Sequence, residues 1–558
     1  MAVALKPTPI AGKSPSIADK SLGEKFASRQ SNELIIAFAG PMGCGISNLI
    51  GGMIERLKER GYTDVVHIKL SKFLEKAIAE KLVVEWLPEQ GSSARRSRYR
   101  RLQEAGKELR QRSKNPAILA EYAAQEIAVD RTRRAMEKAG AVGDGETIVP
   151  GRVAYLIDQV KRPEEVALLR TVYRNLFFLA GVTRIYDARA TALEGESVTS
   201  GEIVALMEID RSEGGKGGQQ LDKTLHLADY FIRNDATTID EKKRKVNRFL
   251  DLIHGDKSVT PTDSEHGMYS AYCASLRSAC LSRQVGAAIA TPTGEVIATG
   301  CNDVPKSGGG LYNSSFNGTD MRCVHRDGQE CFNDLHKRKL QDEIGGIIDA
   351  SLAGASTPVT LSMPDRTSLL ESIYNNTRLG GLIEFSRSVH AEMDAIVSLS
   401  RIGGSGTEGA TLYTTTFPCH SCARHIVAAG IARVFYVEPY EKSLAKELHS
   451  DAIAFEIEPT QDAAPKKVEF LHFEGVAPRQ FHNMFRAQSR KNSAGKFVPI
   501  KVQEADKMVP EYLDSYQDFE AKAVEHLVEQ IAGLEAISID KPILVSEDRN
   551  HNTNMGEG

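Results

Sequence analysis

The sequence has few cysteines and few aromatic residues, and it lacks any long apolar run. Of its 558 residues only 8 are cysteine and 1 is tryptophan, and Phe, Tyr and Trp together make up 6%. Cysteines this sparse exclude the disulfide framework on which small secreted domains depend. Without an apolar run of about 18 residues or an apolar leader, we expect no membrane span, no secretory signal and a cytoplasmic protein.

The sequence also lacks a charge excess of either sign. It has 70 Lys and Arg against 74 Asp and Glu, for a net charge of -4. A whole-surface affinity for nucleic acid would need a basic excess, which is missing here. Because single cores usually stop growing near about 250 to 300 residues, the length predicts more than one domain.

Alternating strand and helix patterns predict two α/β domains. The first opens with the apolar strand pattern "NELIIAFAG" and continues through the expected strands "VVHIKL", "RVAYLID" and "TRIYDA". We place a mobile segment at 1–30, the first domain at 31–255, the second at 265–485 with an insertion at 305–385, and a helical extension with a mobile tail at 486–558.

The second predicted domain contains a metal-ligand pattern. His390 and Glu392 lie in "VHAEMDAI", and Cys419 and Cys422 lie in "FPCHSCARH", each at the start of a predicted helix. One imidazole and two thiolates leave the fourth tetrahedral position of Zn2+ to water, as in catalytic sites. Glu392 is then placed to move a proton. This combination, H-x-E with P-C-x-x-C, is the signature of zinc nucleobase deaminases. A structural zinc, two buried thiols or a redox pair would leave Glu392 without a role.

Together with "SLRSACLSRQVGAAIA" and "ATGCNDVP", these motifs resemble the deoxycytidylate deaminase family over about residues 265–450. The resemblance implies a cytidine deaminase-like α/β/α fold and a hydrolase that cleaves the C–N bond of a deoxycytidine nucleotide. It also implies zinc binding by His390, Cys419 and Cys422, proton transfer by Glu392, and contact between Asn302 and the sugar. Lys442 and Ser443, which follow the last predicted core strand, are candidates for contact with substrate phosphates.

A glycine-rich loop, "GPMGCGIS", follows the first predicted strand. It resembles the phosphate-binding P-loop, and its candidate nucleotide-binding residues are Gly40, Gly43, Gly45 and Ser47. Ile46 replaces the usual lysine, so backbone N–H groups could cradle phosphates without that charge. Asp158, at the end of an apolar strand, is a candidate for positioning Mg2+. We therefore predict a P-loop kinase-like three-layer domain that binds a nucleotide and regulates the protein.

The chain as a whole resembles bacterial anti-phage deaminases that fuse a P-loop kinase-like domain to a deoxycytidylate deaminase. That resemblance implies conversion of dCTP and dCMP to dUTP and dUMP, depletion of the dCTP pool during infection, and an inhibitory small RNA as a partner. A homo-oligomer is also expected. The preference between dCTP and dCMP is left open by the sequence.

Two other functions are weighed. A cytidine deaminase of single-stranded DNA or RNA would need basic residues and stacking aromatics beside the zinc, which the aromatic content of 6% disfavours. A nucleotide kinase with a structural zinc should carry the missing P-loop lysine.

Four weaker patterns are also present. Cys323, His325, Cys331 and His336 could form a second zinc set by residue type, but the spacing is not a standard one, and polar residues of the insertion are the favoured interpretation. Cys273 and Cys280 are expected in the core. The arginine-rich run at 95–101 is either a phosphate or RNA clamp or a solvated face, and 212–220 is expected to form a lid loop.

Overall fold

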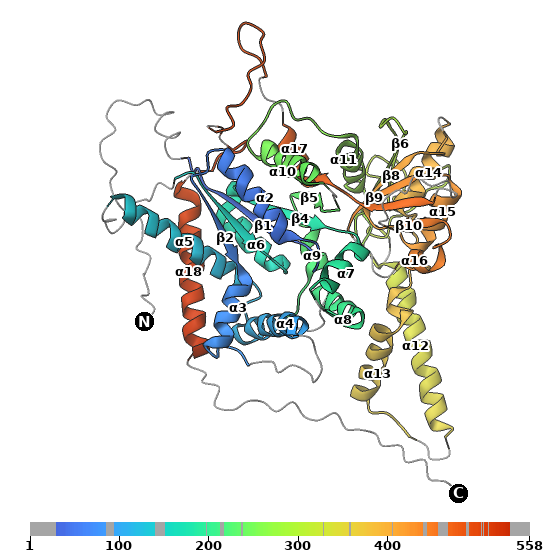
Figure 1. The fold of residues 1–558 in the computed structure, drawn as a ribbon. Helices are drawn as coiled ribbons and strands as arrows, with labels where there is room; N and C mark the ends of the chain where they lie inside the picture. The colour runs from blue at the N-terminus through green and yellow to red at the C-terminus, as the bar shows by residue number, and fades with distance from the viewer. Residues whose placement is uncertain are drawn as a thin grey trace. The chain divides into compact units, whose positions relative to one another are not determined.

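The protein folds into two compact units (Figure 1). Unit 1 comprises Met1–Ala228, Asn234–Leu250 and Ile500–Gly558, and unit 2 comprises Asp229–Arg233 and Asp251–Pro499. This computed structural model describes residues 30–84, 94–139, 151–196, 198–211, 217–235, 238–326, 328–355, 359–403, 406–438, 443–455, 467–486, 490–503, 505, 507–511 and 513–535. The segments predicted to be mobile, at 1–29 and in the C-terminal tail, lie outside the described residues, as does most of the predicted lid loop.

Unit 1 is built on a parallel sheet with the strand order β4-β1-β3-β2. Its strands are β1 (Leu34–Ala39), β2 (Asp64–Lys69), β3 (Val153–Asp158) and β4 (Phe177–Thr183). All six residues of β1 are buried, as expected for a central parallel strand covered on both faces. Because β1 and β3 are parallel neighbours, the loop after Ala39 and the side chain of Asp158 lie at the same edge of the sheet.

Unit 1 contains both long and short helices. They are α2 (Ile46–Glu59), α3 (Leu70–Ala79), α4 (Ala94–Ser113), α5 (Ile118–Ala139), α6 (Pro163–Tyr173), α7 (Tyr186–Glu194), α8 (Ser200–Arg211), α9 (Leu221–Leu225), most of α10 (Ile239–Ile253), and α18 (Leu513–Glu535), with a short 3-10 turn at Arg174–Leu176. The strand predicted at "TRIYDA" is wrong. The buried strand is the preceding apolar segment "FFLAGVT", which forms β4 and ends at Thr183. Helix α7 already begins at Tyr186.

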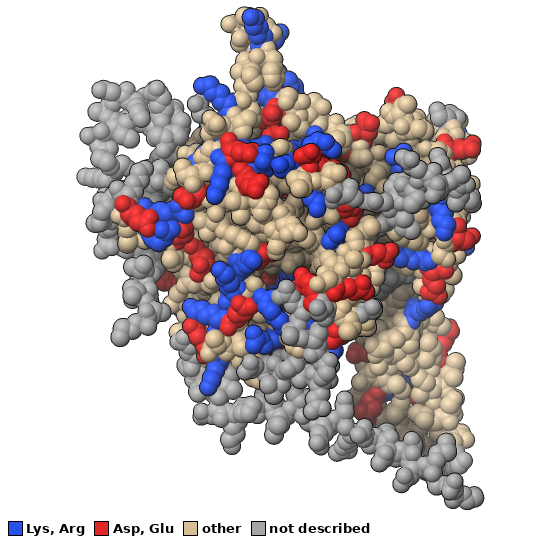
Figure 2. All heavy atoms as spheres, in the orientation of Figure 1, with Lys and Arg blue, Asp and Glu red and all other residues tan. Residues whose placement is uncertain are grey.

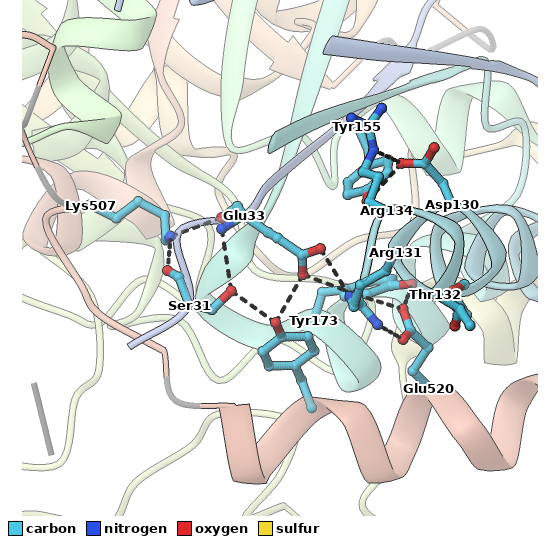
Figure 3. A network of polar contacts seen from close by, with 12 residues as sticks. Ser31, Glu33, Asp130, Arg131, Thr132, Arg134, Tyr155, Tyr173, Lys507 and Glu520 are labelled. Atoms are coloured by element: carbon cyan, nitrogen blue, oxygen red, sulfur yellow. Dashed lines mark hydrogen bonds and ion pairs between the residues drawn. The ribbon is translucent and has the colours of Figure 1, made fainter. Parts of the chain in front are cut away.

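The C-terminal helix α18 packs on α5 and α6 of unit 1, although it follows unit 2 in the sequence. A buried polar network joins these elements (Figure 3). The guanidinium of Arg131 on α5 donates to both oxygens of Glu33, at 2.9 and 3.0 Å, and to both oxygens of Glu520 on α18. The hydroxyl of Tyr173 donates to Glu520, and that of Tyr516 donates to Glu33 at 2.9 Å.

Unit 2 has a mixed sheet in the order β10-β11-β9-β8-β6-β7. The hairpin of β6 and β7 and the β6–β8 pair are antiparallel, and the pairs from β8 through β9 and β11 to β10 are parallel. The strands are β6 (Gly286–Ala290), β7 (Val296–Cys301), β8 (Thr411–Thr416), β9 (Arg433–Glu438), β10 (Ile453–Phe455) and β11 (Val468–His472), and β5 (Tyr230–Arg233) pairs antiparallel with β12 (Gly475–Val476).

The helices of unit 2 carry the candidate site and the insertion. They are α11 (Asp263–Ser275), α12 (Phe332–Ala353), α13 (Met363–Asn376), α14 (Ala391–Ile402), α15 (His420–Ala428), α16 (Ala445–Leu448) and α17 (Phe481–Phe485), with 3-10 turns at Arg378–Gly381 and Pro478–Gln480. The predicted insertion forms the helical hairpin of α12 and α13, which extends away from the sheet of unit 2 (Figure 1). Both units are mixed α/β, as predicted.

Throughout the part of the chain that the structure describes, every helix is too short or too polar to span a membrane.

Candidate active site

Two helix starts bring the predicted zinc ligands together. His390 is the residue before α14, and Cys419 is the residue before α15, and both have extended backbone. The Cys422 backbone N–H donates to the Cys419 sulfur at 3.4 Å, so the sulfur caps α15. The free N–H groups and the dipole of a helix start favour negative charge, which suits thiolate ligands.

The geometry of these three side chains fits a tetrahedral zinc ion. The Nδ1 atom of His390 lies 3.3 Å from the Cys419 sulfur and 3.4 Å from the Cys422 sulfur. A tetrahedral ion with ordinary Zn–S and Zn–N bonds would hold sulfur and nitrogen about 3.5 Å apart. Among the described residues, this is the one cluster of at least three potential ligands whose donor atoms all lie within 4.8 Å of one another.

Without a metal, only one of the three ligands, Cys419, is held in the protonation state that binds a metal. A hydrogen bond from Cys422 lowers the pKa of Cys419 to about 4 against the opposing effect of burial, and His390 adds to the lowering. The Cys419 sulfur in turn raises the pKa of His390 to about 9. The pKa of Cys422 is raised by its hydrogen bond to Cys419 and by burial. One thiolate is thus favoured, and metal binding must release the remaining protons.

Glu392 lies beside the cluster but is not one of its ligands. Its side chain is buried in the first turn of α14, and the Cys422 thiol donates to its Oε2 atom at 3.4 Å. Burial raises the pKa of Glu392 above its usual range. His390, Cys419 and Glu392 line a cavity of about 190 Å³. A carboxyl whose proton affinity is raised, at the wall of a cavity, is suited to proton transfer.

Of the three residues predicted to contact substrate, only Asn302 is seen to line the cavity. Its amide accepts from the Val285 N–H at 2.7 Å and donates to the Arg283 carbonyl at 2.8 Å. The Ser443 hydroxyl donates to the Pro418 carbonyl at 2.8 Å, which ties it to the loop before Cys419. Lys442 lies outside the described residues. Substrate contact by these three residues stays a prediction.

Sequence reasoning missed that two arginines and the insertion form part of the cavity wall. Arg283, Phe332 and Arg387 all line it. Arg387 lies over the Phe332 ring at 5.2 Å and donates to the Met321 carbonyl at 3.0 Å, while Arg283 is ion-paired with Glu438. Arg387 stands just before His390 in the sequence. This closeness to the zinc-ligand motif was the signal that could have predicted its place at the cavity.

The structure contradicts one weaker cysteine prediction, the core placement of Cys273 and Cys280, and favours the interpretation of the second candidate zinc set as polar insertion residues. In the described part of the insertion, the second candidate zinc set is not brought together. His325 lies 3.6 Å from Asp320, and the ring of His336 stacks on Phe385. Cys273 is exposed on α11, whereas Cys280 lies beyond the end of that helix and lines the cavity. The predicted core helix ends at Ser275, which removes the periodicity on which the core assignment rested.

Gly300 on β7 fixes how closely α14 approaches the sheet. A Cβ at this position would lie 2.3 Å from the Ala391 carbonyl oxygen and 2.3 Å from the Ala395 nitrogen, both in the backbone of α14. We expect Gly300→Ala to displace the helix start that carries His390 and Glu392, to destabilise unit 2 by about 1–3 kcal/mol, and to lower both zinc content and activity. Thermal unfolding, zinc per chain and deaminase rate measure these effects.

Gly346→Ala is the matched control for this substitution. Gly346 lies in α12, and a Cβ added there would have nothing within 4 Å, so helix propensity alone should make the change neutral or slightly stabilising. Equal behaviour of the two variants would contradict the steric argument.

The candidate nucleotide-binding residues of unit 1 also lie around one cavity. Gly43 and Gly45 have φ values of 80° and 77°, the left-handed conformation that favours glycine, and Gly45 immediately precedes α2. Residues 41–47 of the loop and Asp158 line a cavity of about 460 Å³, whereas Gly40 does not line it. A Cβ at Gly40 would lie 2.6 Å from the Val182 carbonyl oxygen. Asp158 lies 3.1 Å from the His67 ring. Nucleotide and magnesium binding here stay predictions.

The arginine-rich run is only partly available for a ligand. Arg96 lies 3.6 Å from Glu202, Arg98 lies 2.8 Å from Glu75, and Arg100 pairs with Glu104 one turn along α4. These arginines are half-buried and two of them pair with neighbouring helices, so the run is not a solvated helix face. Arg98 also lines the loop cavity.

Comparisons with known proteins agree with the site in unit 2. The family model described as "Cytidine and deoxycytidylate deaminase zinc-binding region" matches residues 261–438. The deoxycytidylate deaminase of Enterobacteria phage T2 is 31% identical over 173 residues, which is 31% of this chain and 78% of that protein. The phage T4 deoxycytidylate deaminase is 30% identical over 173 residues, 31% of this chain and 76% of that protein.

Among solved structures, the dCMP deaminase of cyanophage S-TIM5 aligns with 38% of this chain and 100% of its own, at 17% identity and a TM-score of 0.19. The phage T2 and T4 sequences match this chain over most of their own length. The chain belongs to the deoxycytidylate deaminase family and is a hydrolytic deaminase.

Proposed function

We propose that unit 2 catalyses zinc-dependent hydrolytic deamination of free deoxycytidine nucleotides, dCMP or dCTP, to the corresponding deoxyuridine nucleotides. The observation that carries this proposal is the convergence of His390, Cys419 and Cys422 beside a buried Glu392 at the wall of a cavity. The phage relatives named deoxycytidylate deaminases support the choice of substrate class.

The side chains divide the chemistry between holding the metal and moving protons. His390, Cys419 and Cys422 would hold a zinc ion, whose Lewis acidity lets water ionise near neutral pH. Glu392 would take one proton from the attacking water and give it to the ring nitrogen next to the attacked carbon. It would then take the remaining proton from the added hydroxyl and give it to the amino group, so that the C–N bond breaks, the carbonyl forms and ammonia leaves.

The surroundings of the site favour a free nucleotide over a polynucleotide. The cavity of about 190 Å³ is smaller than the roughly 300–1,000 Å³ of drug-sized ligand pockets, so it suits a single base. Arg387 offers positive charge for a phosphate group at the same cavity, and Arg283 would have to exchange Glu438 for the phosphate to do so. On the face drawn in Figure 2, Lys and Arg are interleaved with Asp and Glu.

The wider role of the protein is proposed from the sequence resemblance. We propose that deamination depletes the dCTP pool during phage infection, and that a nucleotide bound at the glycine-rich loop of unit 1 regulates it. An inhibitory small RNA, assembly as a homo-oligomer and Mg2+ at Asp158 belong to the same proposal.

A substrate panel tests the proposed reaction. The purified zinc-loaded protein is incubated with dCMP, dCTP, cytidine and a cytosine-containing oligonucleotide, and products are separated by chromatography. We expect dCMP or dCTP to be converted at least tenfold faster than the other two. Conversion of the oligonucleotide alone would instead support a polynucleotide deaminase, and no conversion of any substrate would reject the proposed activity.

A further inference from the structure

Two charged side chains from other parts of unit 1, a lysine and an aspartate, contact the glycine-rich loop. Lys161 follows β3, and its ammonium group is ion-paired with Asp210 on α8 and lies 3.5 Å from the Gly40 carbonyl oxygen. The other carboxylate oxygen of Asp210 accepts from the Met42 backbone N–H at 2.7 Å. Asp210 is 1% exposed and Lys161 14% exposed, so both charges are largely removed from water.

Asp210 accepts from a kind of group that phosphate-binding loops use for their ligand, the backbone N–H. Here an internal carboxylate takes one of those N–H groups, at Met42. The acceptor that this N–H group meets is therefore a carboxylate of the protein itself. A stability role alone is a weak explanation, since buried ion pairs contribute little net stability against apolar replacements.

The sequence lacks the usual positive charge of such a loop, because Ile46 stands in the lysine position. Ile46 is 5% exposed and cannot interact electrostatically with phosphate. Lys161 reaches the same loop from the neighbouring strand end, and both Lys161 and Asp210 line the cavity of about 460 Å³ that the loop opens onto. That volume is within the range of ligand pockets.

We propose that Lys161 supplies the cation that Ile46 lacks, and that Asp210 is a built-in competitor that a nucleotide's phosphate group must displace. The proposal rests on the proposed nucleotide site of unit 1 and specifies which residues govern it. When phosphate replaces the carboxylate, Lys161 changes partner and α8 loses its tie to the loop. Binding at the loop would thereby be coupled to the position of α8.

Calorimetric titration of the full-length protein with ATP, and separately with inorganic tripolyphosphate, tests the proposal. We expect Lys161→Met to weaken both ligands by roughly ten- to hundredfold, the range of a charge-assisted hydrogen bond. We expect Asp210→Asn, which removes the competing charge but keeps the shape, to tighten both by about tenfold. Lys76→Met, at an exposed position of α3, is the control and should leave both affinities unchanged. Thermal unfolding of each variant checks that the fold is kept.

The outcomes separate this inference from the proposed site. If the unaltered protein binds ATP and Lys161→Met binds it equally well, the nucleotide site stands and the role of Lys161 is rejected. If Asp210→Asn binds ATP no more tightly than the unaltered protein does, the competitor role is rejected. If neither the unaltered protein nor Asp210→Asn binds ATP or tripolyphosphate, the nucleotide site itself is rejected and this inference with it.

Discussion

Glu392→Gln is expected to lower the deamination rate by about 10²- to 10⁴-fold, the usual contribution of a general acid–base group, while about one zinc per chain is retained. The amide keeps the shape of the buried side chain but cannot take up and release the proton that the reaction moves. Because the clustered ligand atoms belong to His390, Cys419 and Cys422, the metal should stay bound. Steady-state rates with dCMP and dCTP, together with metal analysis of the same samples, measure both quantities.

Glu371→Gln is the matched control, since Glu371 is exposed on α13 away from the cavity. It should leave rate and zinc content unchanged. Loss of zinc in Glu392→Gln would show that the carboxylate helps to hold the metal. A rate close to that of the unaltered protein would show that another group moves the proton.

Arg131→Met is expected to destabilise unit 1 by about 3–5 kcal/mol, because it leaves two buried carboxylates without their shared cation. The side chains of Glu33 and Glu520 are 0% and 4% exposed, so water cannot replace the lost partner. Since the network joins the start of β1 to α5 and α18, the loss should open these elements together (Figure 3). Hydrogen exchange of the α5 and α18 amides, with denaturant titration, measures the change.

Arg133→Met provides the control on the same helix. Arg133 is 53% exposed and pairs with Asp130 and Glu137 at the surface, where ion pairs contribute about 0–1 kcal/mol. If Arg133→Met speeds hydrogen exchange as much as Arg131→Met does, the proposal that the buried network holds these elements together is rejected. A triple variant that also carries Glu33→Gln and Glu520→Gln should recover much of the stability, because no buried charge is left unpaired.

The network also predicts how the Arg131→Met defect depends on pH. Burial raises the pKa of Glu520 above its usual range, so the folded protein holds that proton more tightly than the unfolded chain does. The stability linked to this group is therefore present at low pH and falls as pH rises from the usual glutamate range through the raised pKa. Removing the nearby cation raises that pKa further. The destabilisation should thus be smaller near pH 5 than near pH 8, and a larger defect at pH 5 would contradict this.

The metal cluster could be predicted from the sequence because each half of it is local. His390 and Glu392 lie within one helix turn, as do Cys419 and Cys422, so residue spacing already places each pair at a helix start. The mixed α/β class was predictable for a similar reason, since strand and helix periodicities are short-range. The misplaced strand at "TRIYDA" shows the limit, because burial of β4 in the sheet decides which apolar segment becomes the strand.

Other features depended on contacts between distant segments. No spacing rule indicated that Phe332 and Arg387 would form a wall of the cavity, that α18 would return to unit 1, or that Lys161 and Asp210 would meet at the glycine-rich loop. The second cysteine and histidine set had suitable residue types, yet the fold of the insertion keeps its members apart.

The amino-acid sequence by itself determined the chemistry available to this protein, namely three zinc-type ligands with an adjacent carboxyl, and a phosphate-loop pattern without its lysine. The tertiary structure alone decided which charges face those groups. Ligand spacing is set by the geometry of a single helix turn, whereas the pairing of Lys161 with Asp210, and of Arg131 with Glu33 and Glu520, is set by packing that brings remote side chains out of water together.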